Sequence, residues 1–400
     1  MFCDNIYNMK KKILQGLCAL LLLISSQNIS LAETTVNFTY INGSNNNNEK
    51  MRTWFEEGVK KLHPEMKKQF ETNEQIHQLM LNPEGITIDD EPNIFFWGYN
   101  SKNNFDFVSE HLDMSKDFSP TIAYHVRSLI TQFMHDAIWV QKTHHMLPIV
   151  RNLNEVVKKE YEQGNSTILY GYSAGTFITY EYLFNTLPYL NLQHLFNNID
   201  VPNEMREFVA ENPRPNTCLM ALSEAKLGAV TSAGHLVFDS NIESLKEHYL
   251  ALDEATQKVC SPEGAVKGIV NFASPLVLFY SDLADKNYDL NFYNKLMLKY
   301  IMENRMFMLS VNFREDPLAF PSTRNLTYQE MEQMVGQEFT DPSGFVYDNS
   351  GVWSWRPFFL AHTSYWSARK RFAKAVVKSF IDGYRFQYDQ LYRQKILDKQ

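Results

Sequence analysis

A serine between two glycines has the setting that most directly suggests chemistry in this sequence. Ser173 lies in the motif GYSAG, residues 171–175, which follows the short apolar run 167–170 and precedes a segment with helical character. A Gly-x-Ser-x-Gly turn between a strand and a helix presents a serine on a strained backbone, where small neighbours avoid a clash. The motif alone is weak, and a structural glycine-rich turn is the alternative. The strand before it and the helix after it favour a nucleophile.

A histidine near the C-terminus could serve this serine as a general base. A serine hydroxyl needs such a base, and on this kind of turn an acid and then a histidine follow the serine in the chain. His362, in PFFLAHTSYW, is the one histidine after His248 and precedes the last predicted helix. It could instead be a packed or surface histidine among aromatic residues. His235 is its chief competitor but precedes the good acid candidates.

The acid is expected directly after a late strand. Residues 306–313 read as a strand, and the proline after Asp316 ends it and restrains Asp316 to an extended backbone. We predict that Asp316 orients the His362 ring and stabilises its imidazolium form. Glu315 and Asp282 are alternatives, and an acidic residue at a strand end can equally be a solvated surface group.

Two backbone N–H groups are predicted to form an oxyanion hole. The first belongs to Ala174, the residue after the nucleophile. The second is expected in the loop after an early strand, where the sequence INGS occupies residues 41–44. Gly43 would let the backbone approach closely, and Ser44 is the expected donor. A simple Asn-Gly turn is the alternative.

The remaining pattern predicts the α/β class. Helical segments, including 49–80 and the C-terminal region, alternate with short strands at 35–42, 94–97, 167–170, 268–273 and 306–313. Such alternation favours a mostly parallel sheet flanked by helices on both faces.

Residues 188–264 interrupt this alternation with several prolines and both cysteines of the mature chain. We predict an inserted cap here that lines an acyl pocket, between two core parts at 33–187 and 265–400. The alternative is extra helices packed on the core. Cys218 and Cys260 could form a disulfide, worth roughly 3–4 kcal/mol in the chain-entropy model, or remain two buried thiols.

The N-terminal residues 1–32 are predicted to be a secretory signal peptide. Three lysines at 10–12 precede the mostly apolar run 13–24, and a small-residue site ends at Ala32. The apolar run is short for a bilayer span, which needs about 20 residues, although an uncleaved anchor is the alternative. The protein is therefore expected in the periplasm or outside the cell.

Charge gives little reason to expect a charged macromolecular partner. The net charge of −8 offers no electrostatic footprint for nucleic acid. His144 and His145 are adjacent, so on a helix they cannot face one metal ion together. No metal or cofactor site is predicted.

With these residues together, the chain resembles the α/β-hydrolase superfamily. The resemblance rests on GYSAG at 171–175, INGS at 41–44, the strand end at Asp316 and His362 in AHTSYW, and covers most of 35–400 apart from the cap. The loop resembles an "NG" variant rather than the usual His-Gly. The resemblance implies a metal-independent acyl hydrolase that works through an acyl-serine intermediate. We expect a small-molecule or lipid ester as its substrate, and transient contact with a membrane surface is left open.

The same fold leaves other functions open. A peptidase, a thioesterase or an acyltransferase could use the same three residues. A hydrolase fold without activity, used as a binding module, belongs to a different class. Such a module would be expected to lose at least one member of the triad, and Ser173, Asp316 and His362 are all present.

Overall fold

A computed structural model gives the arrangement of most of the chain. It describes residues 35–44, 49–79, 86–115, 121–230, 236–237, 241–277, 290–321 and 325–397. The predicted signal peptide, the alternative base His235 and the alternative acid Asp282 lie outside the described residues.

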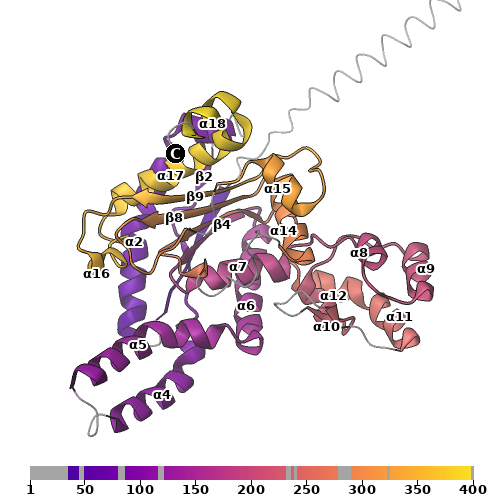
Figure 1. The fold of residues 1–400 in the computed structure, drawn as a ribbon, viewed down its shortest axis with the longest axis horizontal. Coiled ribbons are helices and arrows are strands. Elements are labelled where there is room, and N and C mark those ends of the chain that lie inside the picture. The colour runs from indigo at the N-terminus through magenta and orange to yellow at the C-terminus, as the bar shows by residue number, and fades with distance from the viewer. Residues whose placement is uncertain are drawn as a thin grey trace, which may run out of the picture. The chain divides into compact units, whose positions relative to one another are not determined.

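Seven strands form one parallel sheet in the described residues (Figure 1). They pair in the order β2-β1-β4-β7-β8-β9, and β3 also pairs with β1. Every pairing is parallel. The strands are β1 (Thr35–Ile41), β2 (Thr87–Ile88), β3 (Asn93–Phe95), β4 (Ser166–Tyr172), β7 (Val266–Phe272), β8 (Phe307–Phe313) and β9 (Phe345–Val352). The prediction of an α/β protein with a mostly parallel sheet is confirmed.

The order of the strands reverses beside β1. β2 and β3 pair with one side of β1, and β4 pairs with the other side, where Ile41 is opposite Gly171. The chain therefore leaves β1 in one direction and returns past it to β4. As a result, the carboxyl ends of β1 and β4 lie next to each other.

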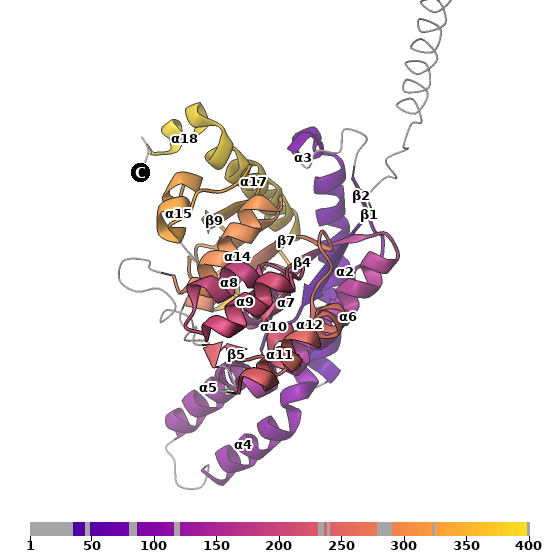
Figure 2. The same ribbon diagram turned by 90° about the vertical axis from the view of Figure 1, so that its right-hand side faces the viewer.

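Helices cover both faces of this sheet, and the alternation of side chains along the strands explains why (Figure 2). Phe38 and Tyr40 of β1 belong to one buried cluster, whereas Ile41 belongs to the other, as expected for a strand whose side chains alternate between faces. The first cluster includes residues of α2 (Glu49–Glu71) and α17 (Arg369–Tyr388), and the second those of α6 (Thr143–Glu162), α7 (Gly175–Thr186) and α14 (Phe292–Glu303).

Some elements differ from the prediction. The helical region predicted at 49–80 consists of α2 and α3 (Glu74–Leu79). The long helical stretch that follows is divided into η1 (Gly98–Ser101), α4 (Lys102–Met114), α5 (Thr121–Val140) and α6. The sequence pattern did not reveal β9, because only its first three residues, 345–347, are consistently apolar. Residues 348–351 are polar or small, as a strand at the end of the sheet allows.

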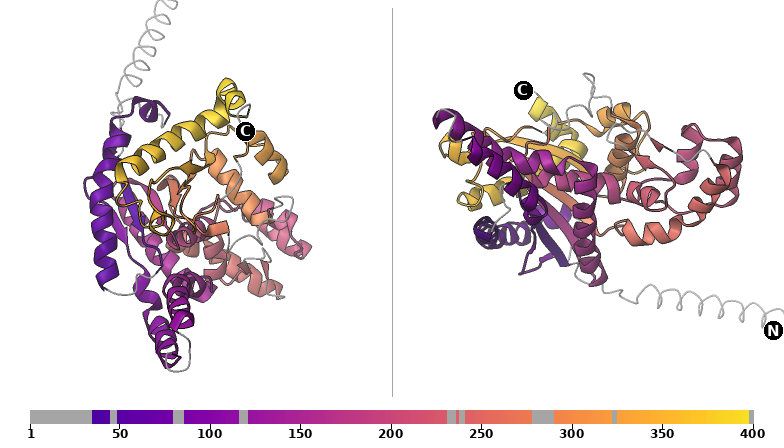
Figure 3. Two further views of the ribbon diagram at one scale, coloured as in Figure 1. Left: turned by 60° about the vertical axis from the view of Figure 1, so that its left-hand side comes forward. Right: turned by 90° about the horizontal axis from the view of Figure 1, so that it is seen from below.

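The described residues of the segment 188–264 form short helices and a small two-stranded antiparallel sheet. These are α8 (Leu192–Asn198), α9 (Asn203–Glu211), α10 (Leu219–Glu224), β5 (Ala229–Val230), β6 (Leu236–Val237), α11 (Ile242–Leu250) and α12 (Leu252–Val259). Figure 1 shows these helices at the right, on the opposite side of the picture from α16 (Phe358–Ala361), and Figure 3 shows the chain from two further directions. The other helices in the described residues are α15 (Tyr328–Val335) and α18 (Gln390–Leu397).

The segment 188–264 begins at the end of α7 that lies away from Ser173. It returns to the core at Ser261, whose N–H donates to the carbonyl oxygen of Thr186 at 2.8 Å. At 1.5 Å per residue, the 12 residues of α7 separate this point from the serine by about 18 Å. The function of the segment as a cap over the acyl pocket stays a prediction.

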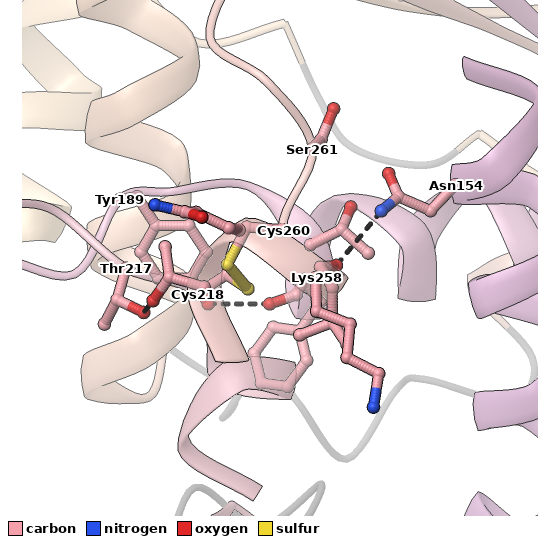
Figure 4. The surroundings of a disulfide bond; sticks show 12 residues. Asn154, Tyr189, Thr217, Cys218, Lys258, Cys260 and Ser261 are labelled. Atoms are coloured by element: carbon pink, nitrogen blue, oxygen red, sulfur yellow. Dashed lines mark hydrogen bonds between the residues drawn. A yellow bond between two sulfur atoms is a disulfide. The ribbon is translucent and has the colours of Figure 1, made fainter. Parts of the chain in front are cut away.

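A disulfide joins the two cysteines of this segment (Figure 4). Cys218 precedes α10 and Cys260 follows α12, and their Cα atoms are 5.8 Å apart. Asn154 of α6 donates from Nδ2 to the carbonyl oxygen of Val259 at 3.1 Å, beside this bond. Of the two alternatives that the sequence left open, the structure shows the pairing. The disulfide therefore closes the segment where it meets the core.

Candidate active site

Ser173 occupies a strained turn between β4 and α7. Its φ of 52° lies in the left-handed region, which is uncommon for residues other than glycine and costs about 1–3 kcal/mol. The Ser173 N–H donates to the carbonyl oxygen of Phe272 on β7 at 3.0 Å. The Ser173 carbonyl oxygen accepts bonds from the N–H of Thr176 at 3.0 Å and from its Oγ1 at 2.7 Å. These bonds hold the strained backbone on both sides.

Glycines allow the loop after β1 to pack directly on this turn. A Cβ added to Gly43 would lie 2.7 Å from the Cβ of Ser173, which is closer than side chains tolerate. A Cβ added to Gly175 would lie 2.7 Å from the carbonyl oxygens of Ile41 and Asn42. The close approach predicted for Gly43 is therefore present. Gly175, the second glycine of the motif, likewise allows the turn to pack directly on the backbone of the loop after β1.

The structure brings Ser173, His362 and Asp316 together. Nε2 of His362 lies 3.1 Å from Oγ of Ser173, and Nδ1 lies 3.0 Å from each carboxylate oxygen of Asp316. A carboxylate only accepts hydrogen bonds, so Nδ1 carries the proton and Nε2 is left to accept one from the serine. All three residues are buried, at 5%, 7% and 5% exposure. The arrangement can remove the serine proton during an attack on a carbonyl carbon.

Tyr365 and the backbone fix the carboxylate of Asp316. The Tyr365 hydroxyl donates to Oδ2 at 3.0 Å and accepts from the N–H of Phe313 at 2.9 Å. The N–H of Leu318 donates to Oδ1 at 3.0 Å. Burial, followed by the nearby charge of Asp316, raises the pKa of Tyr365 well above its usual value, so its hydroxyl remains a donor. The carboxylate thus has defined partners besides His362.

Tyr172 fixes the backbone of the histidine. His362 follows α16 directly, and its carbonyl oxygen accepts a hydrogen bond from the Tyr172 hydroxyl at 2.9 Å. Burial, followed by the charge of Asp316, raises the pKa of Tyr172, which keeps this hydroxyl protonated. Two consecutive residues therefore contact His362: Tyr172 bonds its backbone, and Ser173 bonds its ring.

The alternative acid Glu315 has a different function in the structure. Its two carboxylate oxygens accept the backbone N–H groups of Ser354, at 2.8 Å, and Trp355, at 3.0 Å. It therefore holds the chain between β9 and α16. Asp316 alone of these neighbouring acids contacts His362 among the described residues.

The two predicted oxyanion donors lie on the paired segments that the glycines bring together. Ala174 immediately precedes α7, so its N–H is among those for which a helix offers no internal acceptor. Ser44 follows Gly43 at the end of the described part of the loop. Asn42 anchors this loop, because its Oδ1 accepts the N–H of Trp97 at 2.8 Å and its carbonyl oxygen accepts the Trp97 Nε1–H at 2.6 Å. The donor function of Ser44 and Ala174 stays a prediction.

Three supporting residues were not identified from the sequence. Tyr365 stands three residues after His362, a spacing that places side chains near each other in helical turns. Tyr172 stands inside the GYSAG motif, which requires no particular residue at that position. Asn42 was interpreted only as part of a turn. No pattern in the sequence indicates which partners their polar groups meet, because all three partners come from distant segments.

Two classes of feature are absent from the described part of the chain. No three or more His, Cys, Asp or Glu side chains there are grouped so that they could hold a metal ion. No helix in the same part combines the length and apolar character required to cross a bilayer.

Comparison with known proteins gives no further assignment. No family model, no curated protein and no solved structure matches this chain.

Proposed function

We propose that this protein is an exported serine hydrolase of the α/β-hydrolase type, which cleaves carboxylic esters through an acyl-serine intermediate. The observation that carries the proposal is the hydrogen-bond chain from Ser173 through His362 to Asp316, with the serine at φ 52° between a strand and a helix. A buried chain of this kind is the arrangement that activates a serine nucleophile.

The topology supports the same proposal. The serine, the acid and the histidine follow β4, β8 and β9, in the chain order expected of this fold. The serine also lies where the strand order reverses, between the carboxyl ends of β1 and β4. In doubly wound α/β folds, ligands bind at that point.

In the proposed mechanism, Oγ of Ser173 attacks the ester carbonyl carbon while Nε2 of His362 takes its proton. The N–H groups of Ala174 and Ser44 stabilise the oxyanion. The intermediate collapses to an acyl-serine, and the alcohol leaves with the proton from His362. Water then attacks the acyl group as His362 takes a proton from it, and the acid product and the free serine are released.

The substrate class and the location are also part of the proposal. We propose a small-molecule or lipid ester as substrate, with transient contact with a membrane surface where the ester is a lipid. The Cys218–Cys260 disulfide supports export, because such bonds persist in oxidising compartments such as the periplasm.

A fluorophosphonate probe tests the nucleophile directly. Wild-type protein should be labelled and should hydrolyse p-nitrophenyl esters. Ser173→Ala and His362→Ala should each reduce turnover by about 10⁴-fold or more. Ser223→Ala is the matched control, since Ser223 is an exposed serine on α10. Folded wild-type protein that neither labels nor turns over any ester would favour the inactive binding module.

Substrate panels separate the other activities of the same fold. Esters of increasing chain length should show an optimum that describes the acyl pocket. Peptide anilides and acyl thioesters distinguish a peptidase and a thioesterase, and transfer to an added alcohol in place of water identifies an acyltransferase. A preference for any of these over esters would replace the proposed reaction while retaining Ser173 as the nucleophile.

A further inference from the structure

A cationic pocket lies at the start of α17. It has a volume of about 460 Å³, and four of its lining residues carry positive charges: Arg356, Arg369, Lys370 and Arg371. Trp355 and small residues complete the described lining, which contains no acidic side chain. The pocket therefore concentrates positive charge in a protein whose net charge is −8.

The charges of the pocket are poorly compensated within the described residues. Nε of Arg369 lies 4.0 Å from Oε1 of Glu65, at the outer limit of an ion pair. Arg371 donates to the carbonyl oxygens of Trp353 and Ser354, which are neutral acceptors. No carboxylate in the described structure lies within ion-pair distance of Arg356, Lys370 or Arg371. Because like charges repel, such a cluster is stabilised by a bound anion.

Residues 353–355, which we name the strap, include two lining residues of the pocket, Ser354 and Trp355, and are held in place from two directions. Glu315 accepts the N–H groups of Ser354 and Trp355, while Arg371 donates to carbonyl oxygens of the strap. Trp355 has a φ of 60° and a side chain that is 74% exposed. A strained residue persists only where its surroundings fix it. The pocket is therefore preformed.

Glu315 retains the negative charge that this arrangement needs. Burial alone would raise the pKa of its carboxyl, but the backbone N–H groups of Ser354 and Trp355 outweigh burial and hold the pKa below its usual value. The clamp on the strap is thus present at neutral pH.

We propose that this pocket binds a phosphate group, either as a free anion or on an organic molecule such as a lipid headgroup. Guanidinium groups match the oxygens of phosphate with paired hydrogen bonds, and a lysine adds a compact charge. The volume also leaves room for a substituent beside Trp355. The proposal goes beyond the proposed hydrolase activity and does not depend on it.

Two double variants with the same change in charge test the pocket. Arg356→Gln/Lys370→Gln removes two pocket charges, neither of which the strap requires. The control, Lys60→Gln/Lys374→Gln, removes two exposed charges that do not line the pocket, and Lys374 lies one turn after Lys370 on α17. Binding of inorganic phosphate is measured by calorimetry, and co-sedimentation is measured with vesicles of equal parts phosphatidylcholine and phosphatidylglycerol.

Binding of inorganic phosphate that weakens about 100-fold in the pocket variant, about tenfold per charge, and is unchanged in the control supports a site for a free anion. No phosphate binding, but vesicle binding that depends on the pocket residues and not on the control pair, supports a lipid headgroup. The proposal is overturned if wild-type protein binds neither probe. It is also overturned if the two double variants lose binding equally, because that outcome indicates only diffuse attraction. None of these readouts requires Ser173.

Discussion

At the scale of single residues, Tyr365 connects the acid to the strand that carries it. Its hydroxyl bridges Oδ2 of Asp316 and the N–H of Phe313, and its ring stacks on that of Phe313 with centroids 4.1 Å apart. Tyr365 thereby positions Asp316 without contacting Ser173, so its contribution should appear in catalysis through the orientation of His362.

Replacing Tyr365 with phenylalanine should therefore impair the chemical step. A hydrogen bond to a charged group is worth about 1.5–3 kcal/mol, so kcat should fall by about 10- to 100-fold with KM little changed. The measurements are ester kinetics across pH and the rate of fluorophosphonate labelling. Tyr161→Phe is the control, because Tyr161 is exposed on α6. Wild-type kinetics and an unshifted pH profile in Tyr365→Phe would show that the bridge is only structural.

A second prediction concerns Gly43. The methyl group of Gly43→Ala would lie 2.7 Å from Cβ of Ser173 and 3.0 Å from the carbonyl oxygen of Tyr172, so the loop or the turn must move. We expect a loss of ester turnover of about 100-fold or more, as for the loss of an oxyanion donor. Gly351→Ala is the matched control, since its added Cβ meets no atom closer than 3.8 Å. Equal activity of the two variants would contradict the close packing of the loop.

At the scale of elements, removing the Cys218–Cys260 disulfide is expected to lower the stability of the protein without abolishing its activity. Cys218→Ser/Cys260→Ser should lower the free energy of unfolding by about 3–4 kcal/mol, measured by chemical denaturation. Ester turnover should persist under native conditions, because the segment 188–264 starts about 18 Å from Ser173 along α7. Loss of turnover in a variant that remains folded would instead support the expectation that this segment lines the acyl pocket.

Some elements could be predicted from the sequence pattern, and others could not. The apolar faces of α6 and α17 were predicted, since Ile149, Leu153, Phe372 and Val376 repeat at helical spacing and are buried. The strand β9 was not predicted, because its polar second half carries no such pattern. The triad residues were identified from local motifs and chain order. Their supporting contacts could not be, since these depend on which distant segments the sheet places together.

At the scale of the whole molecule, a buried histidine should make stability depend on pH. His63 is a buried residue of α2 whose ring contacts that of Phe38 on β1. Its Nε2 lies 2.8 Å from the carbonyl oxygen of Asp89. Its folded pKa is lowered from 6.5, chiefly by burial. Protonation therefore favours the unfolded chain, whose histidine titrates near about pH 6.5. The contribution of neutral His63 to the free energy of unfolding is therefore complete above about pH 6.5. It is lost as the pH falls from there through the lowered pKa of His63 in the folded protein.

His63→Gln removes this titration and retains a donor for Asp89. The unfolding free energy of wild-type protein should fall more steeply than that of the variant between about pH 7.5 and pH 5.5. His194→Gln is the control, because His194 is exposed on α8. Parallel pH dependence in wild type and His63→Gln would show that His63 titrates alike in the folded and unfolded chain.

The packing of α17 has a consequence for biosynthesis. α17 follows His362 in the chain and packs against α2, near the opposite end of the described sequence, in the same buried cluster. A nascent chain that has not yet been made past α17 holds Ser173 without the packed base that would activate it. The proposed esterase activity would therefore be absent until α17 has been synthesised and has packed against α2.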